Sequence, residues 1–219
     1  MARSEAARTA LLDAAERLFA GSGIAQVSDR RIAETAGNTN HSAVRYYFGG
    51  RTGLLQALLT RHLVALEEPR RALSGRSDSV LGDVRSLVIP FTDALAALPQ
   101  PSSRARFIAQ ALQDPATAGV LRESADLAPT ASAIAHSVAD RLHHLDRGVV
   151  TGRARLMTRI VSTTCADVER QSEEDGTDAS WHAVGDFLAD AIAGMLSAPV
   201  THRPGALPGA ADHPAALVL

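Results

Sequence analysis

The hydrophobic residues of this chain recur with the 3.6-residue period of an α-helix, in segments that glycine and proline separate. One apolar stripe near the N-terminus consists of Ala7, Leu11, Ala14, Ala15 and Leu18. This stripe predicts an amphipathic helix that ends at Gly21 or Gly23. Its apolar face is suited to cover the back of the segment that follows.

Residues 27–59 predict two short helices separated by a glycine turn, and then a longer helix. Ser28 precedes the first short helix and has a side chain typical of an N-cap, while Val27 and Ile32 stand where a hydrophobic staple closes. Gly37 marks the end of this helix, because glycine readily adopts the left-handed conformation.

The second short helix is predicted to begin at Asn40 or its neighbour, after a turn over residues 37–40. It buries Val44 and Phe48 at a spacing of four residues, and the two glycines after Phe48 end it. The side chains left facing outward are His41, Ser42, Arg45 and either Tyr46 or Tyr47. Those residue types contact bases and phosphates, so the segment is predicted to be a helix-turn-helix unit that binds DNA.

A plain helical hairpin is the alternative, with the tyrosines in the core and the arginines as solvated surface charge. The charge distribution favours DNA binding. Residues 1–66 contain eight arginines and five acidic residues, whereas the whole chain has a net charge of −2. Positive charge is therefore concentrated on the segment that carries the helix-turn-helix.

Composition favours helix packing, because 46% of the residues are hydrophobic but only 4% are aromatic, with many alanines and leucines. We expect an all-α fold with a three-helix N-terminal head and a larger C-terminal helical domain for ligand binding and dimerisation. The predicted boundaries are residues 1–52 for the DNA-binding domain and 53–198 for the helical domain. Residues 199–219, rich in proline, glycine and alanine, are expected to be a disordered tail.

Helix breakers divide the region after the motif. Pro69 and residues 75–79 are expected to interrupt the chain, and Ser102 or Ser103 to cap a later helix that ends at residues 114–115.

Two long apolar stripes near the end predict a helical hairpin. One consists of Met157, Ile160, Val161, Thr164, Cys165 and Val168, and the other of Val184, Phe187, Leu188, Ala191 and Met195. They form either a core within the chain or an interface with a second chain. We favour a homodimer, because a helix-turn-helix protein that reads a palindromic site needs two heads. The predicted interface residues are Val161, Cys165, Val184, Phe187, Leu188 and Met195.

Signals for other chemistry are weak. The chain lacks the G-x-S-x-G and H-E-x-x-H motifs and a complete dinucleotide-binding glycine pattern, so an enzyme is not expected. His143 and His144 with Asp146 suggest a metal, but adjacent helical positions point apart, which favours a solvated helix end. Cys165, the single cysteine, is expected to be a buried thiol rather than a redox sensor.

No long apolar run and no signal-like N-terminus occur. We therefore expect a cytoplasmic protein with no membrane partner, and we expect no cofactor and no metal.

The first third of the chain resembles the TetR family of bacterial transcriptional regulators. The matching positions are Leu18, Phe19, Gly23, Ser28, Ile32, Ala33, Ala36, Gly37, Val44, Tyr46, Tyr47, Phe48, Arg51 and Leu54 or Leu55. Three departures occur. The turn at residues 38–41 is one residue longer than the common form, Arg45 replaces a usual tyrosine, and Arg51 replaces a usual lysine.

This resemblance implies a set of DNA contacts: Ser28, Arg30, Asn40, His41, Ser42, Ala43, Arg45, Tyr46, Tyr47 and Arg51. Ser28 and Arg30 would open the first motif helix against the DNA. Residues 41–43 and Arg45 would face the major groove, while the two tyrosines and Arg51 would hold phosphates. For Tyr46, a place in the core beside Val44 is an equal alternative.

The resemblance also implies a dimeric repressor that a small-molecule effector releases from a palindromic double-stranded DNA operator. A mostly apolar ligand pocket is expected between about residues 84 and 157, with Phe91, Phe107, His136 and Met157 as wall residues. A filled core would use the same residues. The alternatives are an all-α small-molecule-binding protein or enzyme that does not use its helix-turn-helix on an operator, and an architectural DNA protein without ligand control.

Overall fold

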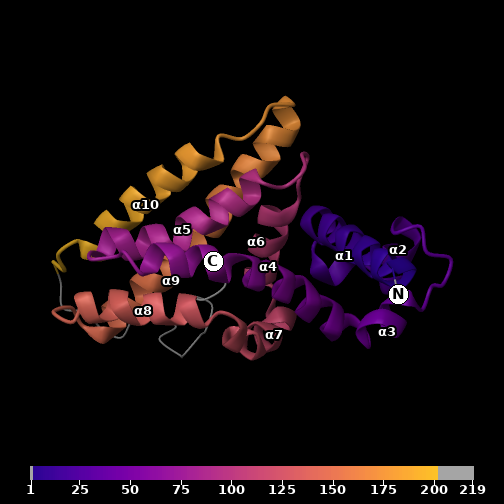
Figure 1. The fold of residues 1–219 in the computed structure, drawn as a ribbon, viewed down its shortest axis with the longest axis horizontal. Helices are drawn as coiled ribbons and strands as arrows, with labels where there is room; N and C mark the ends of the chain where they lie inside the picture. The colour runs from indigo at the N-terminus through magenta and orange to yellow at the C-terminus, as the bar shows by residue number, and fades with distance from the viewer. Residues whose placement is uncertain (1, 202–219) are drawn as a thin grey trace.

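Ten α-helices and three short 3-10 turns make up residues 2–201, the part of the chain that this computed structural model describes, and no strand occurs there (Figure 1). The all-α prediction is confirmed. The α-helices are α1 (Ala2–Ser22), α2 (Asp29–Thr35), α3 (Ala43–Phe48), α4 (Arg51–Ser74), α5 (Val80–Ala96), α6 (Arg104–Gln113), α7 (Ala118–Glu123), α8 (Pro129–Arg141), α9 (Arg147–Asp175) and α10 (Trp181–Ser197). The 3-10 turns are η1 (Ile24–Gln26), η2 (Pro115–Thr117) and η3 (Ala125–Leu127).

Helices α1, α2 and α3 form a head at one end of the molecule, at the right of Figure 1. The stripe predicted near the N-terminus lies inside this head, where Leu11, Ala14 and Ala15 are fully buried. Helix α1 ends just before Gly23, whose φ of 81° is accessible to glycine at little cost. The predicted first helix and its end are therefore confirmed.

Helix α4 runs without interruption from the head into the C-terminal domain, which comprises the remaining helices (Figure 1). The predicted break at Pro69 is wrong, because Pro69 lies inside α4. A proline within a helix costs about 3 kcal/mol, but its neighbours Leu66 and Arg70 are buried, and the helix packs against α5 and α8. The predicted domain boundary at residues 52–53 falls in the first turn of α4 and stays a prediction.

Helix α5 is the centre of the C-terminal domain, since it contacts α4, α8 and α10. Figure 1 shows α10 lying along α5. A Cβ atom at Gly185 of α10 would lie 2.4 Å from the hydroxyl oxygen of Thr92 in α5, so glycine is what allows these two helices to approach closely. Helix α6 packs on both α9 and α1 and so joins the C-terminal domain to the head.

The last part of the chain follows the predicted hairpin, with α9 and α10 joined by a loop over residues 176–180. Residues 199–201 have no regular secondary structure, and the rest of the predicted tail, residues 202–219, lies outside the described residues.

Helix α7 had no counterpart in the sequence prediction. Within residues 2–201, no helix is both long enough and apolar enough to cross a membrane.

Candidate nucleic-acid interface

The N-terminus of α2 is built as the sequence predicts. The Ser28 hydroxyl accepts a hydrogen bond from the backbone N–H of Arg31 at 3.2 Å, and Val27 and Ile32 are both buried. This cap leaves the first turn of α2 at the surface, with Arg31 exposed and without an ion pair among the described residues. The sequence prediction did not include Arg31, although its position three residues after the cap places it in that turn.

Arg30 is tied to its own helix. Its Nε donates to the Glu34 carboxylate at 2.8 Å, and His41 Nδ1 lies 3.6 Å from the same oxygen. The hydrogen bond from Arg30, opposed by partial desolvation and aided by the charges of Arg30 and His41, lowers the pKa of Glu34 below its ordinary value. This exposed cluster links α2 to the turn and competes with DNA for Arg30.

Two asparagine side chains shape the lengthened turn. Asn38 Oδ1 accepts the backbone N–H of Asn40, and Asn40 Oδ1 accepts that of Ser42, both at 2.9 Å. The turn begins at Gly37, which has a φ of 68°. Because the asparagines hold the backbone in turns, α3 begins at Ala43 rather than near Asn40. Asn40 thus has a structural role within the turn, and its predicted DNA contact is untested.

Helix α3 presents a short outward face. Ala43 and Val44 are fully buried, so the prediction that Ala43 faces the major groove is wrong, because the later helix start turns its methyl group into the core. Ser42, Arg45 and Tyr46 are exposed, as is His41 before them. The structure gives Arg45 no ion pair among the described residues.

The two tyrosines of α3 differ. Tyr46 is 76% exposed, which excludes the alternative that its ring lies in the core. Tyr47 is half-buried and packs on the core. The rings of Tyr46 and Tyr47 meet edge to face, with their centroids 4.9 Å apart. Both remain predicted phosphate contacts, and Tyr46 is the more accessible.

Arg51 is bonded inside the head, and its predicted phosphate contact is untested. Its Nη1 donates to Asp29 at 3.1 Å, its Nη2 donates to the Ile24 carbonyl, and its guanidinium lies 4.4 Å from the centre of the Phe19 ring. These partners come from α1, η1 and α2, so Arg51 fixes the start of α4 inside the head. The local sequence could not show them, since they are 22 to 32 positions away.

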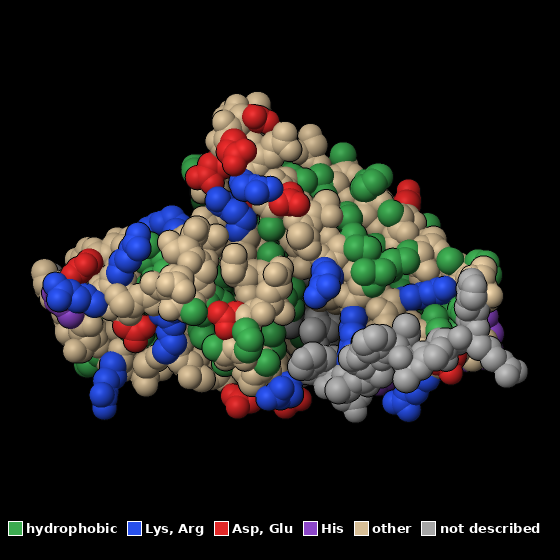
Figure 2. All heavy atoms as spheres, turned by 180° about the vertical axis from the view of Figure 1, so that it is seen from behind, with side chains coloured by type: hydrophobic (Ala, Val, Ile, Leu, Met, Phe, Trp, Pro, Cys, Tyr) green, Lys and Arg blue, Asp and Glu red, His purple; other side chains and the backbone are tan. Residues whose placement is uncertain are grey.

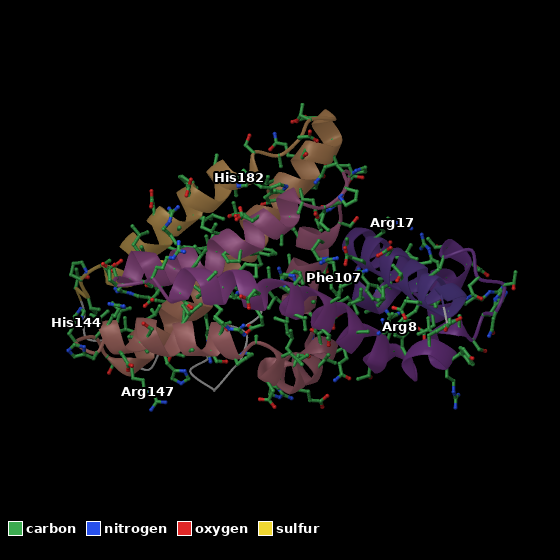
Figure 3. All side chains as sticks on the ribbon, viewed as in Figure 1. Arg8, Arg17, Phe107, His144, Arg147 and His182 are labelled. Carbon is green, nitrogen blue, oxygen red and sulfur yellow. The ribbon has the colours of Figure 1, made fainter. Side chains whose placement is uncertain are left out.

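Glu16 of α1 ties the head to the two helices that reach it. Its carboxylate accepts from Arg61 Nη2 of α4 and from Arg104 Nε of α6, each at 2.7 Å, and Arg61 also donates to Asp13 at 2.6 Å. Burial alone would lower the pKa of Arg61, but the carboxylates of Glu16 and Asp13 outweigh it and leave this pKa raised. Beside these ion pairs the rings of Phe19 and Phe107 stack, with centroids 6.1 Å apart (Figure 3 labels Phe107).

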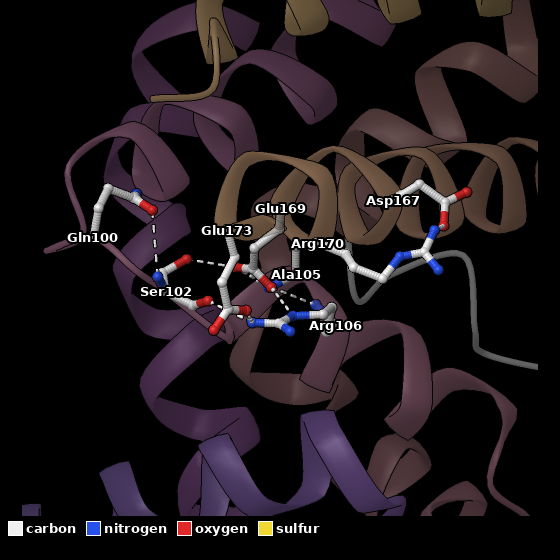
Figure 4. A network of polar contacts seen from close by, with 8 residues as sticks. All are labelled: Gln100, Ser102, Ala105, Arg106, Asp167, Glu169, Arg170 and Glu173. Atoms are coloured by element: carbon white, nitrogen blue, oxygen red, sulfur yellow. Dashed lines mark hydrogen bonds and ion pairs between the residues drawn. The ribbon is translucent and has the colours of Figure 1, made fainter. Parts of the chain in front are cut away.

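Glu169 of α9 holds the N-terminal end of α6 (Figure 4). Its buried carboxylate accepts the backbone N–H groups of Ala105 at 3.2 Å and Arg106 at 3.0 Å, the Arg106 Nε at 3.2 Å, and the Ser102 hydroxyl. The predicted serine cap is therefore wrong: Ser103 occupies the N-cap position without a side-chain cap, and a carboxylate from another helix satisfies the free N–H groups.

The predicted ligand-pocket residues separate into two groups. Phe91, Phe107 and Met157 are buried, and they stay predicted wall residues. His136 is exposed, with its Nδ1 2.7 Å from the Ser132 carbonyl oxygen, so its predicted place on a pocket wall is wrong. None of the four lines the open groove of about 630 Å³ between α1 and α4 or the groove of about 490 Å³ beside the start of α10.

The predicted dimer-interface residues also separate. Val161, Cys165 and Leu188 are buried in the chain's own core, so their assignment to an interface is wrong. Phe187 is 70% exposed, while Val184 and Met195 are half-buried. Burial, aided by the charge of Glu169, raises the pKa of the Cys165 thiol to about 12, so the neutral thiol predominates near neutral pH.

Comparison with known proteins bears on the same part of the chain. No curated protein was found to be similar to it in sequence. Residues 11–58 match the family model described as bacterial regulatory proteins of the tetR family. This match runs from α1 through the helix-turn-helix of α2 and α3 into α4. Over these residues, which make up less than a quarter of the chain, the protein is therefore similar to the DNA-binding part of bacterial regulatory proteins of the tetR family.

Proposed function

We propose that the protein is a homodimeric repressor that a small-molecule effector releases from a palindromic DNA operator. The observation that carries this proposal is the exposed face of α3. Ser42, Arg45 and Tyr46 lie at the surface, while the buried Ala43 and Val44 anchor the helix.

The geometry sharpens the predicted DNA contacts. Arg45, with no ion pair in the described part of the chain, is suited to donate two hydrogen bonds to a guanine, and Ser42 and His41 to contact neighbouring bases. Tyr46 and Arg31 are suited to hold phosphates on either side. We leave Arg51 out of this set, because its Nη1 and Nη2 donate hydrogen bonds inside the head.

The outer faces of α9 and α10 support the homodimer. Phe187 of α10 and Leu156 of α9 are among the large hydrophobic residues that the chain leaves exposed, and Ile160, from the predicted stripe on α9, is half-buried. Figure 2, in which the head is at the left, shows hydrophobic side chains gathered on the C-terminal domain. A second copy covering these residues would remove apolar surface from water and place two heads on one operator.

Contacts between the head and the C-terminal domain offer a route from effector to DNA. Helix α4 is continuous from the C-terminal domain to the head, and α6 is held by Glu169 at its start and by Glu16 through Arg104. An effector that favours a different packing of α4 or α6 would change the orientation of the head, and therefore the spacing of the two α3 helices.

The test begins with selection of binding sequences by the full-length protein from a library of random DNA duplexes. We expect an enriched palindrome, to which Arg45→Ala binds about 5- to 150-fold more weakly, the equivalent of about 1–3 kcal/mol. Arg147→Ala is the matched control, because Arg147 is also exposed and without an ion pair in the described residues but lies on α9. A library that yields no enriched sequence, or an Arg45→Ala protein that binds like wild type, contradicts the proposal.

A further inference from the structure

Arg70 on α4 is the largest fully buried side chain among the described residues, with 0% exposure. It follows Leu63 and Leu66 on the buried face of the helix, at a spacing that favours another hydrophobic residue. An arginine at such a position is almost never fully buried unless it is paired.

No described residue pairs with this guanidinium. Its Nε, Nη1 and Nη2 atoms are all buried, and none has a hydrogen-bond partner. Glu67, one turn earlier, is too far away for an ion pair, and its Oε2 accepts the backbone N–H of Thr130 at 3.1 Å. The other carboxylate oxygen of Glu67 is also buried and without a partner.

The charge on Arg70 persists at neutral pH. Burial lowers its pKa to about 10 against the opposing effect of Glu67, which still leaves the guanidinium protonated. The other buried charges of the C-terminal domain are compensated: Asp83 pairs with Arg141 at 2.9 Å, and Glu169 with Arg106 at 3.2 Å. Among the described residues of this domain, Arg70 is the fully buried charge without an ion-pair partner. A bound anion would supply that partner.

The surroundings define the rest of the ligand. Helix α4 packs against α5 and α8. Glu67, one turn before Arg70, accepts a hydrogen bond from Thr130 in the first turn of α8, and the buried residues of that helix include Ala131 and Ile134. Because these residues are aliphatic, the ligand needs an apolar body next to its anionic group.

We propose that Arg70 binds the carboxylate of a small apolar monocarboxylic acid inside the C-terminal domain, between α4, α5 and α8. A carboxylate matches the planar guanidinium fork with two parallel hydrogen bonds and brings one negative charge to one positive charge. A phosphate dianion would leave a second charge buried without a partner. Neither groove described above is lined by Arg70, so the acid enters by separating α4 from its neighbours.

This inference rests on the proposed function in one respect: the acid is taken to be the effector. Arg70 and Arg61 belong to the same uninterrupted helix, and Arg61 holds Asp13 and Glu16 of the head. Binding of the acid at Arg70 therefore acts on the helix that enters the head.

The test measures the Tm of the full-length protein with octanoate, with 1-octanol as the uncharged probe of the same length, and with inorganic phosphate as the anion without an apolar body. We expect octanoate to raise the Tm of the wild type by about 5–10 °C at 100 times its Kd. We expect 1-octanol and phosphate to have little effect. Arg70→Met should lose the octanoate shift while its own Tm stays equal or rises, because an uncompensated charge has been removed.

Arg70→Lys gives an independent result, since it keeps the charge but loses the planar fork, and should bind octanoate at least about 10-fold more weakly. The proposal is overturned if octanoate fails to raise the wild-type Tm, or shifts wild type and both variants equally. It is also overturned if Arg70→Met lowers the Tm by more than about 5 °C, because the guanidinium would then have partners to lose. If octanoate binds through Arg70 but leaves affinity for the selected duplex unchanged, the site stands and effector control fails. If the protein binds the selected duplex but octanoate does not raise its Tm, the acid site at Arg70 fails and the DNA-binding part of the proposed function stands.

Discussion

Arg45 in the head and Arg70 in the C-terminal domain are both arginines without an ion pair among the described residues, but they stand in opposite environments. Arg45 is exposed and keeps its hydration, so its charge costs little and is open to any phosphate or base that approaches. Arg70 has lost its hydration, so its charge is costly and open only to a ligand that enters the interior. The head is thus suited to a large polyanion, and the C-terminal domain to a small anion.

Arginines of a third kind lie between these two extremes. Arg51, Arg61 and Arg104 are partly buried, and each forms an ion pair with a carboxylate; Arg51 also contacts a carbonyl and an aromatic ring. They hold α1, α4 and α6 together at the junction of the head and the C-terminal domain. The exposure and the partners of each arginine therefore decide the role that we propose for it: DNA contact for Arg45, a link between the two parts for Arg51, Arg61 and Arg104, and ligand binding for Arg70.

The largest expected effect is a difference between two charge substitutions in the last two helices, one in the buried core and one on the exposed face. Val161→Asp should unfold the protein, because Val161 is fully buried and an unpaired charge there costs several kcal/mol. Phe187→Asp, on the exposed side of α10, should keep the helical circular dichroism and a Tm close to that of wild type, but halve the mass in light scattering. A wild-type protein that is already monomeric at micromolar concentration would refute the dimer.

The next effect concerns the contact between α9 and α6. Glu169→Gln should lower the free energy of unfolding by about 2–3 kcal/mol, because a neutral amide replaces the charged acceptor of two backbone N–H groups and of Arg106 Nε, while Arg106 keeps its ion pair with Glu173. Asp167→Asn on the same helix is the control, since Asp167 and Arg170 form an exposed pair worth about 0.5 kcal/mol or less. Urea unfolding measures both. Equal losses in the two variants would mean that the buried network contributes no more than a surface pair.

A smaller effect distinguishes the fastening arginine from the reading arginine. Arg51→Ala should lower the free energy of unfolding by about 1–2 kcal/mol, because it removes a hydrogen bond to Asp29 and the contact with Phe19. Arg45→Ala should change it by less than about 0.5 kcal/mol and act on duplex affinity alone. Urea unfolding together with fluorescence anisotropy of a labelled duplex gives both quantities. If Arg45→Ala is the more destabilising variant, the two roles have been assigned the wrong way round.

Features that depend on a few neighbouring residues were predictable from the sequence. The Ser28 cap and the ends of α1 and α2 near glycines follow from local capping and backbone preferences. The start of α3 was placed too early, because two asparagine side chains extend the turn that precedes it. That shift of a few residues is what turned Ala43 from the predicted groove face into the core.

Features that depend on distant partners were not predictable in the same way. The partners of Arg51 and the cap of α6 by Glu169 join residues far apart in sequence, so neither leaves a local pattern. An apolar stripe shows that a helix face is buried, but not whether the same chain or a second one buries it. The prediction therefore placed Val161 and Leu188 at the dimer interface, although they lie in the chain's own core.

The smallest expected effect probes how tightly the α9 face is closed around Cys165. Its pKa of about 12 leaves about one thiol in ten thousand ionised at pH 8, and burial restricts access further. Alkylation by iodoacetamide should therefore be at least about a thousandfold slower in the native protein than in concentrated urea. Glu169→Gln should speed the native reaction a few-fold, since the charge of Glu169 contributes to the raised pKa, whereas Asp167→Asn should not. Fast alkylation of the native wild type would show that this face opens readily, and would place Cys165 with the accessible residues of α9 rather than with the buried Val161.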